Sequence, residues 1–526
     1  MILFSLLSDF ILNNLPILPI AIGLLTAPMM LFLRQHPKGQ KSAAVLVSLL
    51  LLAVAVIMIR EVYTNGILVY DIGEFGKYGI VLVADMLSSL MVLLTSFIGF
   101  AVIIYSFDYI EAKSLNISYY PLFYLMLAGI FGIFLTGDLF NLFVFFEIMF
   151  LSSTGLIMAN EALSVTETSH KLEATYKYMV LGMLGSFMML VAIVSIYASV
   201  GSLNMADLSA KIQIIAETGP IPWVIIGSAL LFIVVFGNKA ALFPLHFWLP
   251  DVHPTAPTPI SAMLSGILIK VGVYCILRVL FLILYPAQNF FLPILMFFSL
   301  LTIAVGAISA MGQSDLKRVL AYSSVSQIGY VLLGLSFGTV GAIAAAVMYL
   351  VNHALAKAML FLTAGGIIHE THTRDLRKMG GLISILPLFS MAFLIGAMSI
   401  GGFPPLGGFI SKFALFQSAV SGGFWLPLLI AVCMAVVTIF YMFRTWIAVF
   451  WGENRDKAHS VDIPIPAVEK KHKISIEIIF PIVILCAAVI LLGLYPEPLY
   501  EIAEIIAVQI LDPTEYITLV LGGAPR

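Results

Sequence analysis

Two lysines stand inside sequence that is otherwise apolar enough to cross a membrane. Lys239 and Lys270 lie in the stretch 236–274, FGNKAALFPLHFWLPDVHPTAPTPISAMLSGILIKVGVY, with five prolines between them. Proline cannot continue a helix, so a broken helix is predicted here. A charge at membrane depth costs roughly 3 kcal/mol, and freed backbone groups there must line a wet or protein-lined interior. The pattern indicates an ion site near the middle of a membrane.

Four more ionisable residues fall inside predicted spans. Glu147, in DLFNLFVFFEIMF, has no polar neighbour within one helical turn, so its carboxylate needs a partner from another helix. His353 and Lys357 are four residues apart and share one helix face. Lys412 follows a second interruption, GGFPPLGGF. The alternative for each is a neutralised or snorkelling side chain, and Arg444 is left open between the two interpretations.

Glutamate, lysine and histidine together are suited to proton transfer. Lysine releases its proton readily when it is desolvated, whereas arginine would hold it. Histidine both accepts and gives a proton near neutral pH. A charged carboxylate would stabilise a protonated lysine, and weakening of that pairing would pass the proton on. The predicted carriers, in order, are Glu147, Lys239, Lys270, His353 or Lys357, and Lys412.

Other motifs favour neither a metal nor a cofactor. The pair His369 and His372 could bind a metal, but a hydrated helix end with His and Arg near its carboxyl terminus is the simpler interpretation. GGFPPLGGF lacks the GK[ST] ending of a phosphate-binding loop. Cys275, Cys433 and Cys486 lie in apolar runs without CxxC spacing. We therefore predict no metal, no cofactor and no self-contained catalytic site.

The composition identifies an integral membrane protein. Of 526 residues, 61% are hydrophobic, which is more apolar surface than the core of a soluble protein could bury. Only 10% are charged, less than half the usual share. The net charge of −2 excludes an electrostatic nucleic-acid footprint. The N-terminus has no basic start and no small-residue cleavage site, so we expect it to be retained rather than removed as a signal peptide.

Apolar windows of about 19 residues predict an all-α fold with fourteen membrane spans. Residues 5–14 form an extra apolar lead that could lie along the membrane surface. The predicted spans are 15–33, 42–59, 83–106, 119–136, 139–159, 176–200, 222–249 (interrupted), 257–282, 289–311, 320–337, 340–367, 383–421 (interrupted), 424–450 and 475–494.

The short loops predict the orientation. Lysines and arginines concentrate in alternate loops, which is the bias of the cytoplasmic face. An even number of spans then places both termini outside. The basic loops are those holding Arg34 to Lys41, Lys113, Lys171 and Lys177, Lys317 and Arg318, Arg374 to Lys378, and Arg455 to Lys473.

Interruptions occur in the seventh and twelfth spans, each the fourth of a block of five. Paired interruptions in corresponding positions indicate an internal repeat, and an offset of five spans makes the second block inverted. The predicted units are 1–118 with spans 1–3, 119–282 as the first repeat, 289–450 as the second, and 451–526 with a cytoplasmic loop, span 14 and the C-terminal tail.

Five strings carry a resemblance to a known family: LTGDLFNLFVFFEIM, KAALFPLHFWLPD, APTPISAML, KRVLAYSSVSQIGY and NHALAKAMLFLTAG. They resemble the antiporter-like subunits shared by multisubunit Na⁺/H⁺ antiporters, respiratory complex I and membrane-bound hydrogenases, from about residue 81 to 450. Within that group the chain looks most like the D-type subunits of Mrp antiporters. The resemblance implies that Glu147 and Lys239 form a key pair, that Lys270 and His353 are central relay residues, and that Lys412 ends the second half-channel.

The resemblance implies a proton-conducting subunit of a cation/proton antiporter in a prokaryotic plasma membrane. Expected partners are other small membrane subunits, the lipid bilayer, protons and Na⁺, and no nucleic acid. Two alternatives remain: a proton-pumping subunit of a hydrogenase or complex I-like enzyme, which the string DVHP at residues 251–254 resembles, and a structural scaffold. A solute symporter acting alone is disfavoured, because no dense set of oxygen ligands for Na⁺ is visible.

Overall fold

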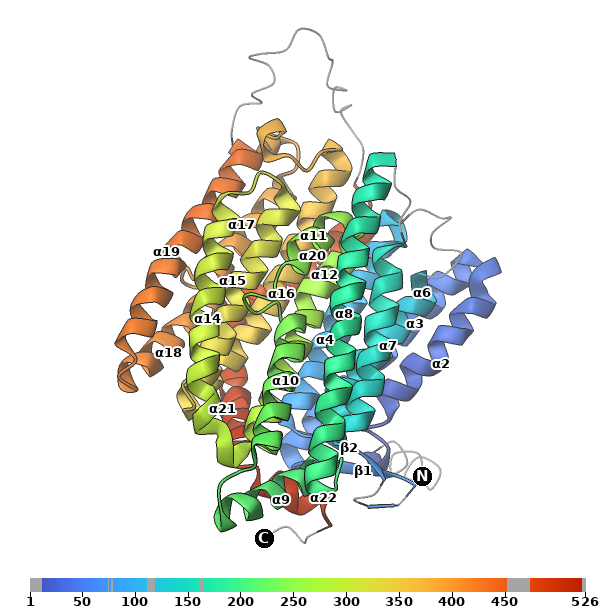
Figure 1. Ribbon diagram of the computed structural model, residues 1–526. Helices are drawn as coiled ribbons and strands as arrows, with labels where there is room; N and C mark the ends of the chain where they lie inside the picture. Colours follow the sequence, from blue (N-terminus) through green and yellow to red (C-terminus); the bar gives the residue numbers. More distant parts are fainter. Residues whose placement is uncertain are drawn as a thin grey trace.

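The computed structural model is a bundle of long helices that run roughly side by side (Figure 1). It describes residues 12–73, 75–76, 79–110, 119–159, 165–451 and 474–522. Most of the apolar lead at 5–14, and the basic residues Lys113 and 455–473, lie outside these ranges.

The first half of the chain forms one hairpin of strands and a series of helices. Its elements are α2 (Leu18–Phe32), η1 (Leu33–Gln35), α3 (Pro37–Asn65), β1 (Leu68–Ile72), β2 (Ile80–Ala84), α4 (Met86–Tyr109), α6 (Tyr120–Leu135), α7 (Leu139–Ile157), α8 (Val165–Val200), α9 (Met205–Thr218), α10 (Trp223–Lys239), α11 (Trp248–Thr255), α12 (Thr258–Met263), the π-helical η4 (Leu264–Leu268), α13 (Ile269–Leu277) and the π-helical η5 (Arg278–Ile283).

The described residues of the second half form a series of helices joined by short loops. It comprises η6 (Tyr285–Ala287), α14 (Gln288–Met311), α15 (Leu316–Ser336), α16 (Val340–Thr371), η7 (Leu376–Lys378), η8 (Leu382–Ser384), α17 (Pro387–Gly401), α18 (Gly407–Ser421), α19 (Trp425–Trp446), the π-helical η9 (Ile447–Trp451), α20 (Ile476–Leu494), α21 (Glu497–Leu511) and α22 (Thr514–Val520).

The predicted spans agree with the helices. In the described ranges, eleven helices are long and apolar enough to cross a membrane, and α6, α10 and α17 are shorter apolar helices. Both predicted interruptions are confirmed, since α10 and α11 divide one span and α17 and α18 the other. Because α6, α10 and α17 are each shorter than 18 residues, the total of fourteen crossings stays a prediction.

The prediction of an exclusively helical chain missed one small sheet. β1 and β2 pair antiparallel, from Leu68 opposite Ala84 to Ile72 opposite Ile80. β2 continues into α4 through Asp85, which caps that helix, so the sheet ends where the span begins. Figure 1 shows the sheet at the same end of the bundle as α9 and α22.

Several basic residues assigned to loops lie on helices instead. α8 begins at Val165, eleven residues before the predicted span, and therefore carries Lys171 and Lys177. Asp315 caps α15 by accepting from the backbone of Arg318, which draws Lys317 into the first turn of that helix. The Lys317 ammonium is buried there and donates to the Ala256 carbonyl at 3.0 Å.

Two matching backbone clamps support the predicted repeat. Isolated antiparallel bridges join Asp138 to Asn204 and Asp315 to Asp375, and each bridge follows the first and third spans of its five-helix block. Five predicted spans separate Asp138 from Asp315, and this odd number places the two bridges at opposite ends of the bundle. At the first bridge, Leu139 N donates to Leu203 O (2.9 Å) and Met205 N to Gly137 O (2.8 Å). At the second, Leu316 N donates to Arg374 O (2.9 Å) and Leu376 N to Ser314 O (2.8 Å).

Helix α16 occupies the core. It contacts helices of every predicted unit, including α4, α12, α15, α18, α20 and α21, and its membrane window is buried completely. Outer helices such as α19 expose large apolar side chains, among them Trp425 and Leu426, as lipid contact requires. His353 and Lys357, in the middle of α16, are therefore surrounded by protein.

Candidate functional site

The first interruption places Lys239 at the end of a helix. α10 ends at Lys239, Ala241 has a positive φ of 58°, and α11 begins only at Trp248. α13 packs directly against this end, because a Cβ at Gly272 would collide with the Phe236 carbonyl and the Ala240 nitrogen. Only glycine allows this approach, so the helix that carries Lys270 is fixed beside Lys239.

The Lys239 ammonium is buried among aromatic rings. It donates to the Tyr178 hydroxyl at 2.6 Å and lies 4.8 Å from the centre of the same ring. The rings of Phe146 and Phe150 are at 5.7 and 5.6 Å. Faces of aromatic rings attract a cation, so these rings would stabilise an ammonium here although no carboxylate of the described residues is in contact with it.

Glu147 and Lys239 are neighbours in the site but do not form an ion pair here. The half-buried Glu147 carboxylate accepts a hydrogen bond from the Ser186 hydroxyl on α8, and among the described residues no cation lies within 4.0 Å of it. Phe146, the residue before Glu147, contacts the lysine instead. The predicted pairing would require one of these side chains to leave its present partner.

Lys270 lies between two π-helical segments. η4 precedes it and η5 begins eight residues after it. The side chain is fully buried, and its ammonium donates back to the Ser265 carbonyl in η4. π-helical turns alter the regular backbone hydrogen bonds and are frequent at functional sites. Here the turn supplies a carbonyl acceptor for a buried cation.

His353 and Lys357 share a buried face of α16, as the spacing predicts. Lys357 donates to the Leu320 carbonyl of α15 at 3.1 Å. Both ring nitrogens of His353 are buried without a hydrogen-bond partner among the described residues. The same holds for His253 of α11, which stacks on Phe361 of α16 at 4.5 Å and which sequence reasoning did not single out. Unpartnered imidazoles of this kind are able to accept and pass a proton.

Lys412 lies beside the second interruption. Its ammonium donates to the Ile400 carbonyl at 2.8 Å, in the last turn of α17. The rings of Tyr330 and Tyr349 lie 4.5 and 5.3 Å from it. A Cβ at Gly408 would collide with the Ser399 carbonyl, so glycine lets α18 return against α17. The carbonyl of the last helical turn before the break therefore accepts from this lysine.

Tyr178 and Tyr349 are functional candidates that sequence reasoning missed. They are separated by the same number of residues as Asn204 and Asp375 of the backbone clamps, so they occupy equivalent positions on α8 and α16. Each ring contacts the lysine of its own broken helix. A search for tyrosines at matching offsets in the two blocks could have found them.

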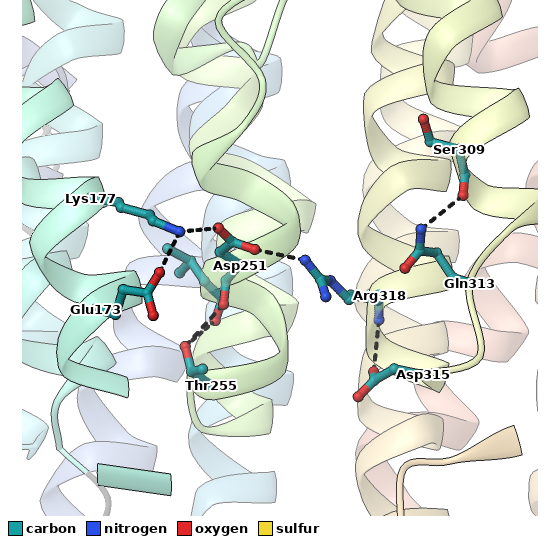
Figure 2. Close-up of polar contacts among 9 residues, drawn as sticks. Glu173, Lys177, Asp251, Thr255, Ser309, Gln313, Asp315 and Arg318 are labelled. Carbon is teal, nitrogen blue, oxygen red and sulfur yellow. Dashed lines mark hydrogen bonds and ion pairs between the residues drawn. The ribbon is translucent and has the colours of Figure 1, made fainter. Parts of the chain in front are cut away.

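Asp251 of α11 joins three helices at the surface near the first interruption (Figure 2). One carboxylate oxygen is 2.9 Å from Lys177 Nζ on α8, and the other is 2.8 Å from Arg318 Nη2 on α15. Lys177 also pairs with Glu173 at 2.8 Å. These partners are partly exposed, so the network positions α11 without enclosing a charge.

Replacing Asp251 with asparagine is expected to lower stability only modestly. Partly exposed ion pairs contribute about 1 kcal/mol or less, and salt screens them. The melting temperature of the purified complex should fall slightly in Asp251→Asn at low ionic strength. The difference from wild type should shrink at about 1 M salt, where the Debye length is about 3 Å. A salt-independent loss would contradict an electrostatic role for the network.

Arg444, His369 and His372 are exposed at the surface. Arg444 is exposed and donates to the Met311 carbonyl, which fits a snorkelling side chain. His369 lies beside Glu370 at 3.5 Å. Among the described residues, no group of three or more His, Cys, Asp or Glu side chains is arranged to hold a metal ion.

A multi-pass helical bundle with two inverted blocks, each placing a buried lysine at a broken helix, defines the class of ion-translocating membrane subunits. The family model for the NADH:quinone oxidoreductase/Mrp antiporter transmembrane region matches residues 136–438. The chain belongs to this family.

The similarity to relatives and to solved structures extends over nearly the whole length of this chain. The chain is 37% identical to the D-type subunit of the Na⁺/H⁺ antiporter of Alkalihalophilus pseudofirmus, over 97% of this chain and 99% of that protein. It is similar to a chain of the Mrp complex from Dietzia sp., with a TM-score of 0.87, 29% identity and 97% and 99% coverage. It is also similar to a chain of the membrane-bound sulfane sulfur reductase, an archaeal respiratory membrane complex. The TM-score is 0.85 and the identity 28%, over 97% of this chain and 100% of that one.

Proposed function

We propose that this chain is the proton-conducting subunit of a multisubunit Na⁺/H⁺ antiporter in a prokaryotic plasma membrane. The carrying observation is the duplicated arrangement in which Lys239 and Lys412 each contact a tyrosine beside a broken helix. Between these two lysines lie the buried residues Lys270, His353 and Lys357. A scaffold would not need a continuous row of buried ionisable groups, because unpaired buried charges destabilise a fold.

The row provides a sequence of proton acceptors. With Glu147 bound to Ser186, the described partners of the Lys239 ammonium are the Tyr178 hydroxyl and the aromatic rings. Movement of Glu147 toward Lys239 would stabilise the proton there, and its return would favour transfer to Lys270. From Lys270 the proton would pass to the α16 pair, His353 and Lys357, and then to Lys412. The carriers follow one another from the first block to the second.

The partners and the orientation extend this proposal. The similar solved structures are membrane complexes, which supports other membrane subunits as partners. Na⁺ would be moved by the complex in exchange for the protons that this chain conducts. We also propose that the end with β1, β2, α9 and α22 faces outside, because the basic loops predict the opposite end to be cytoplasmic.

Purification of the native complex tests the function. In vesicles with an imposed pH gradient, addition of Na⁺ should dissipate the gradient without any electron donor. A requirement for NADH, hydrogen or a sulfur substrate, or co-purification with iron–sulfur and flavin or nickel proteins, would assign the chain to a redox-driven complex instead.

Replacing Tyr178 with phenylalanine is expected to slow exchange about tenfold, because a hydrogen bond to a charged group is worth about 1.5 kcal/mol or more. The ring that contacts Lys239 stays, so the complex should still assemble. Initial rates of Na⁺-driven pH change in vesicles measure the effect. Tyr176→Phe, an exposed position on the same helix, is the control. Equal rates in Tyr178→Phe and wild type would contradict a role for this hydroxyl.

A further inference from the structure

The helix that carries Lys270 continues as a polar row toward the end of the bundle with α9 and α22. Tyr274 follows one turn after Lys270, and Arg278 one turn later opens η5. Arg278 Nε donates to the Tyr274 hydroxyl at 2.9 Å, and that hydroxyl donates to the Phe134 carbonyl. None of these groups belongs to the proton path described above, which leaves Lys270 in the direction of α16.

Arg278 forms a buried ion pair with Asp85 from another helix. Arg278 Nη1 lies 2.6 Å from Asp85 Oδ2, and the two side chains are only 10% and 6% exposed. The other carboxylate oxygen accepts from the Ser88 backbone at 2.8 Å. The guanidinium also lies against the rings of Tyr274 and Tyr516, at 4.9 and 5.5 Å. Tyr516 belongs to α22, so the C-terminal segment covers the pair.

A small cavity connects this ion pair with the surface. It holds about 20 Å³ of water-accessible space, enough for one water molecule, and its lining includes Asp85, Arg278, Gln509, Glu515 and Tyr516. Gln509 Oε1 is buried without a hydrogen-bond partner among the described residues, and Glu515 is exposed. Beyond Lys270, polar side chains thus continue through Tyr274 and the ion pair to this cavity and the exposed Glu515.

The chemistry of the pair opposes proton passage. Arginine does not release its proton under physiological conditions, so it cannot relay one. The Asp85 carboxylate pairs with the Arg278 guanidinium and accepts from the Ser88 backbone, and both contacts favour its ionised form. Asp85 therefore stays ionised and paired, and the fixed guanidinium repels an approaching cation.

We propose that the Asp85–Arg278 pair is a barrier that prevents protons on Lys270 from leaving directly to this end of the membrane. Protons must then continue through α16 to Lys412, which keeps their movement coupled to the second block. This inference rests on the proposed function, because it assumes that Lys270 carries protons. A pair that only holds helices together would give no such control of leakage.

Neutralising both members of the pair tests the barrier. Asp85→Asn combined with Arg278→Gln keeps hydrogen-bonding groups of similar shape and leaves no unpaired buried charge. In vesicles holding the whole complex without Na⁺, an imposed pH gradient should then decay at least about tenfold faster, the effect of a barrier lowered by about 1.4 kcal/mol. Adding Lys270→Ala to this variant should return the leak to the wild-type level.

Two further variants supply a control and a second test of the barrier. Lys211→Gln breaks the ion pair between a partly exposed lysine and Asp207 on α9, at the same end of the bundle but away from Arg278, and should leave the leak unchanged. In Arg278→Lys the new lysine can still pair with Asp85 but is able to release its proton, so this variant should also leak. It takes the place of the double variant if that variant does not assemble.

The leak assay and the exchange assay separate the two proposals. A wild-type leak in whichever Arg278 variant assembles, or a leak that persists after Lys270→Ala is added, would overturn the barrier. If Lys270→Ala alone keeps full Na⁺/H⁺ exchange, the proposed function fails instead.

Discussion

Lys239→Arg is expected to stop Na⁺/H⁺ exchange nearly as completely as Lys239→Ala, by at least about tenfold, because arginine keeps a positive charge but does not release its proton. The three rings around Lys239 can stack with a guanidinium, so the variant should fold and assemble. Dye-reported pH gradients in vesicles with the whole complex measure the loss.

The control for this substitution is Lys211→Arg. Lys211, which is partly exposed, pairs with Asp207 at 2.8 Å on α9, and arginine can keep that pair. It should exchange at the wild-type rate. Wild-type exchange in Lys239→Arg would show that this position needs only a charge, and the proton-carrying role would be lost.

Lys412→Ala is expected to abolish net exchange if the two blocks conduct in series. In the proposed path the ammonium that bonds to Ile400 is the last carrier before the exit, so its loss would stop the flux while Lys239 still exchanges protons with its own side. If each block conducted independently, roughly half of the activity would remain, since two equivalent paths would share the flux. Exchange rates in vesicles carrying Lys412→Ala decide between the two models.

Combination with Glu147→Ala sharpens this test. Under the series model each single variant is already near zero, and the double variant is no worse. A double variant clearly worse than either single one would refute the series path. Lys378→Ala, at an exposed position in η7, is the matched control and should exchange normally.

The broken helices and their lysines could be predicted from sequence because proline and buried charge are local signals. Pro244 and Pro405 stand in strings that no continuous helix tolerates. The interruption before Lys412 also marked that residue, whose ammonium bonds to the Ile400 carbonyl in the last turn before the break. Likewise the spacing of His353 and Lys357 alone determined that they share a face.

What escaped prediction depends on contacts between distant helices. Tyr178 gives no local signal, because a tyrosine in an apolar helix is ordinary until the lysine beside it is known. The partner of Glu147 was expected to be a lysine, but Ser186 from the neighbouring helix satisfies it. The burial of Lys317 follows from the Asp315 cap and from Ala256, sixty-one residues away along the chain. Such partners are set by packing, which periodicity does not encode.

The central position of α16 has a consequence for biosynthesis. α15 and α16 are among the least apolar of the long spans, and 94% and 100% of their membrane windows are buried. Lipid is a poor solvent for their polar groups, so these helices depend on protein neighbours for a stable place in the membrane. Several neighbours of α16, namely α18, α20 and α21, emerge later from the ribosome. The nascent chain must therefore hold these polar spans in a provisional arrangement until the C-terminal helices have been inserted.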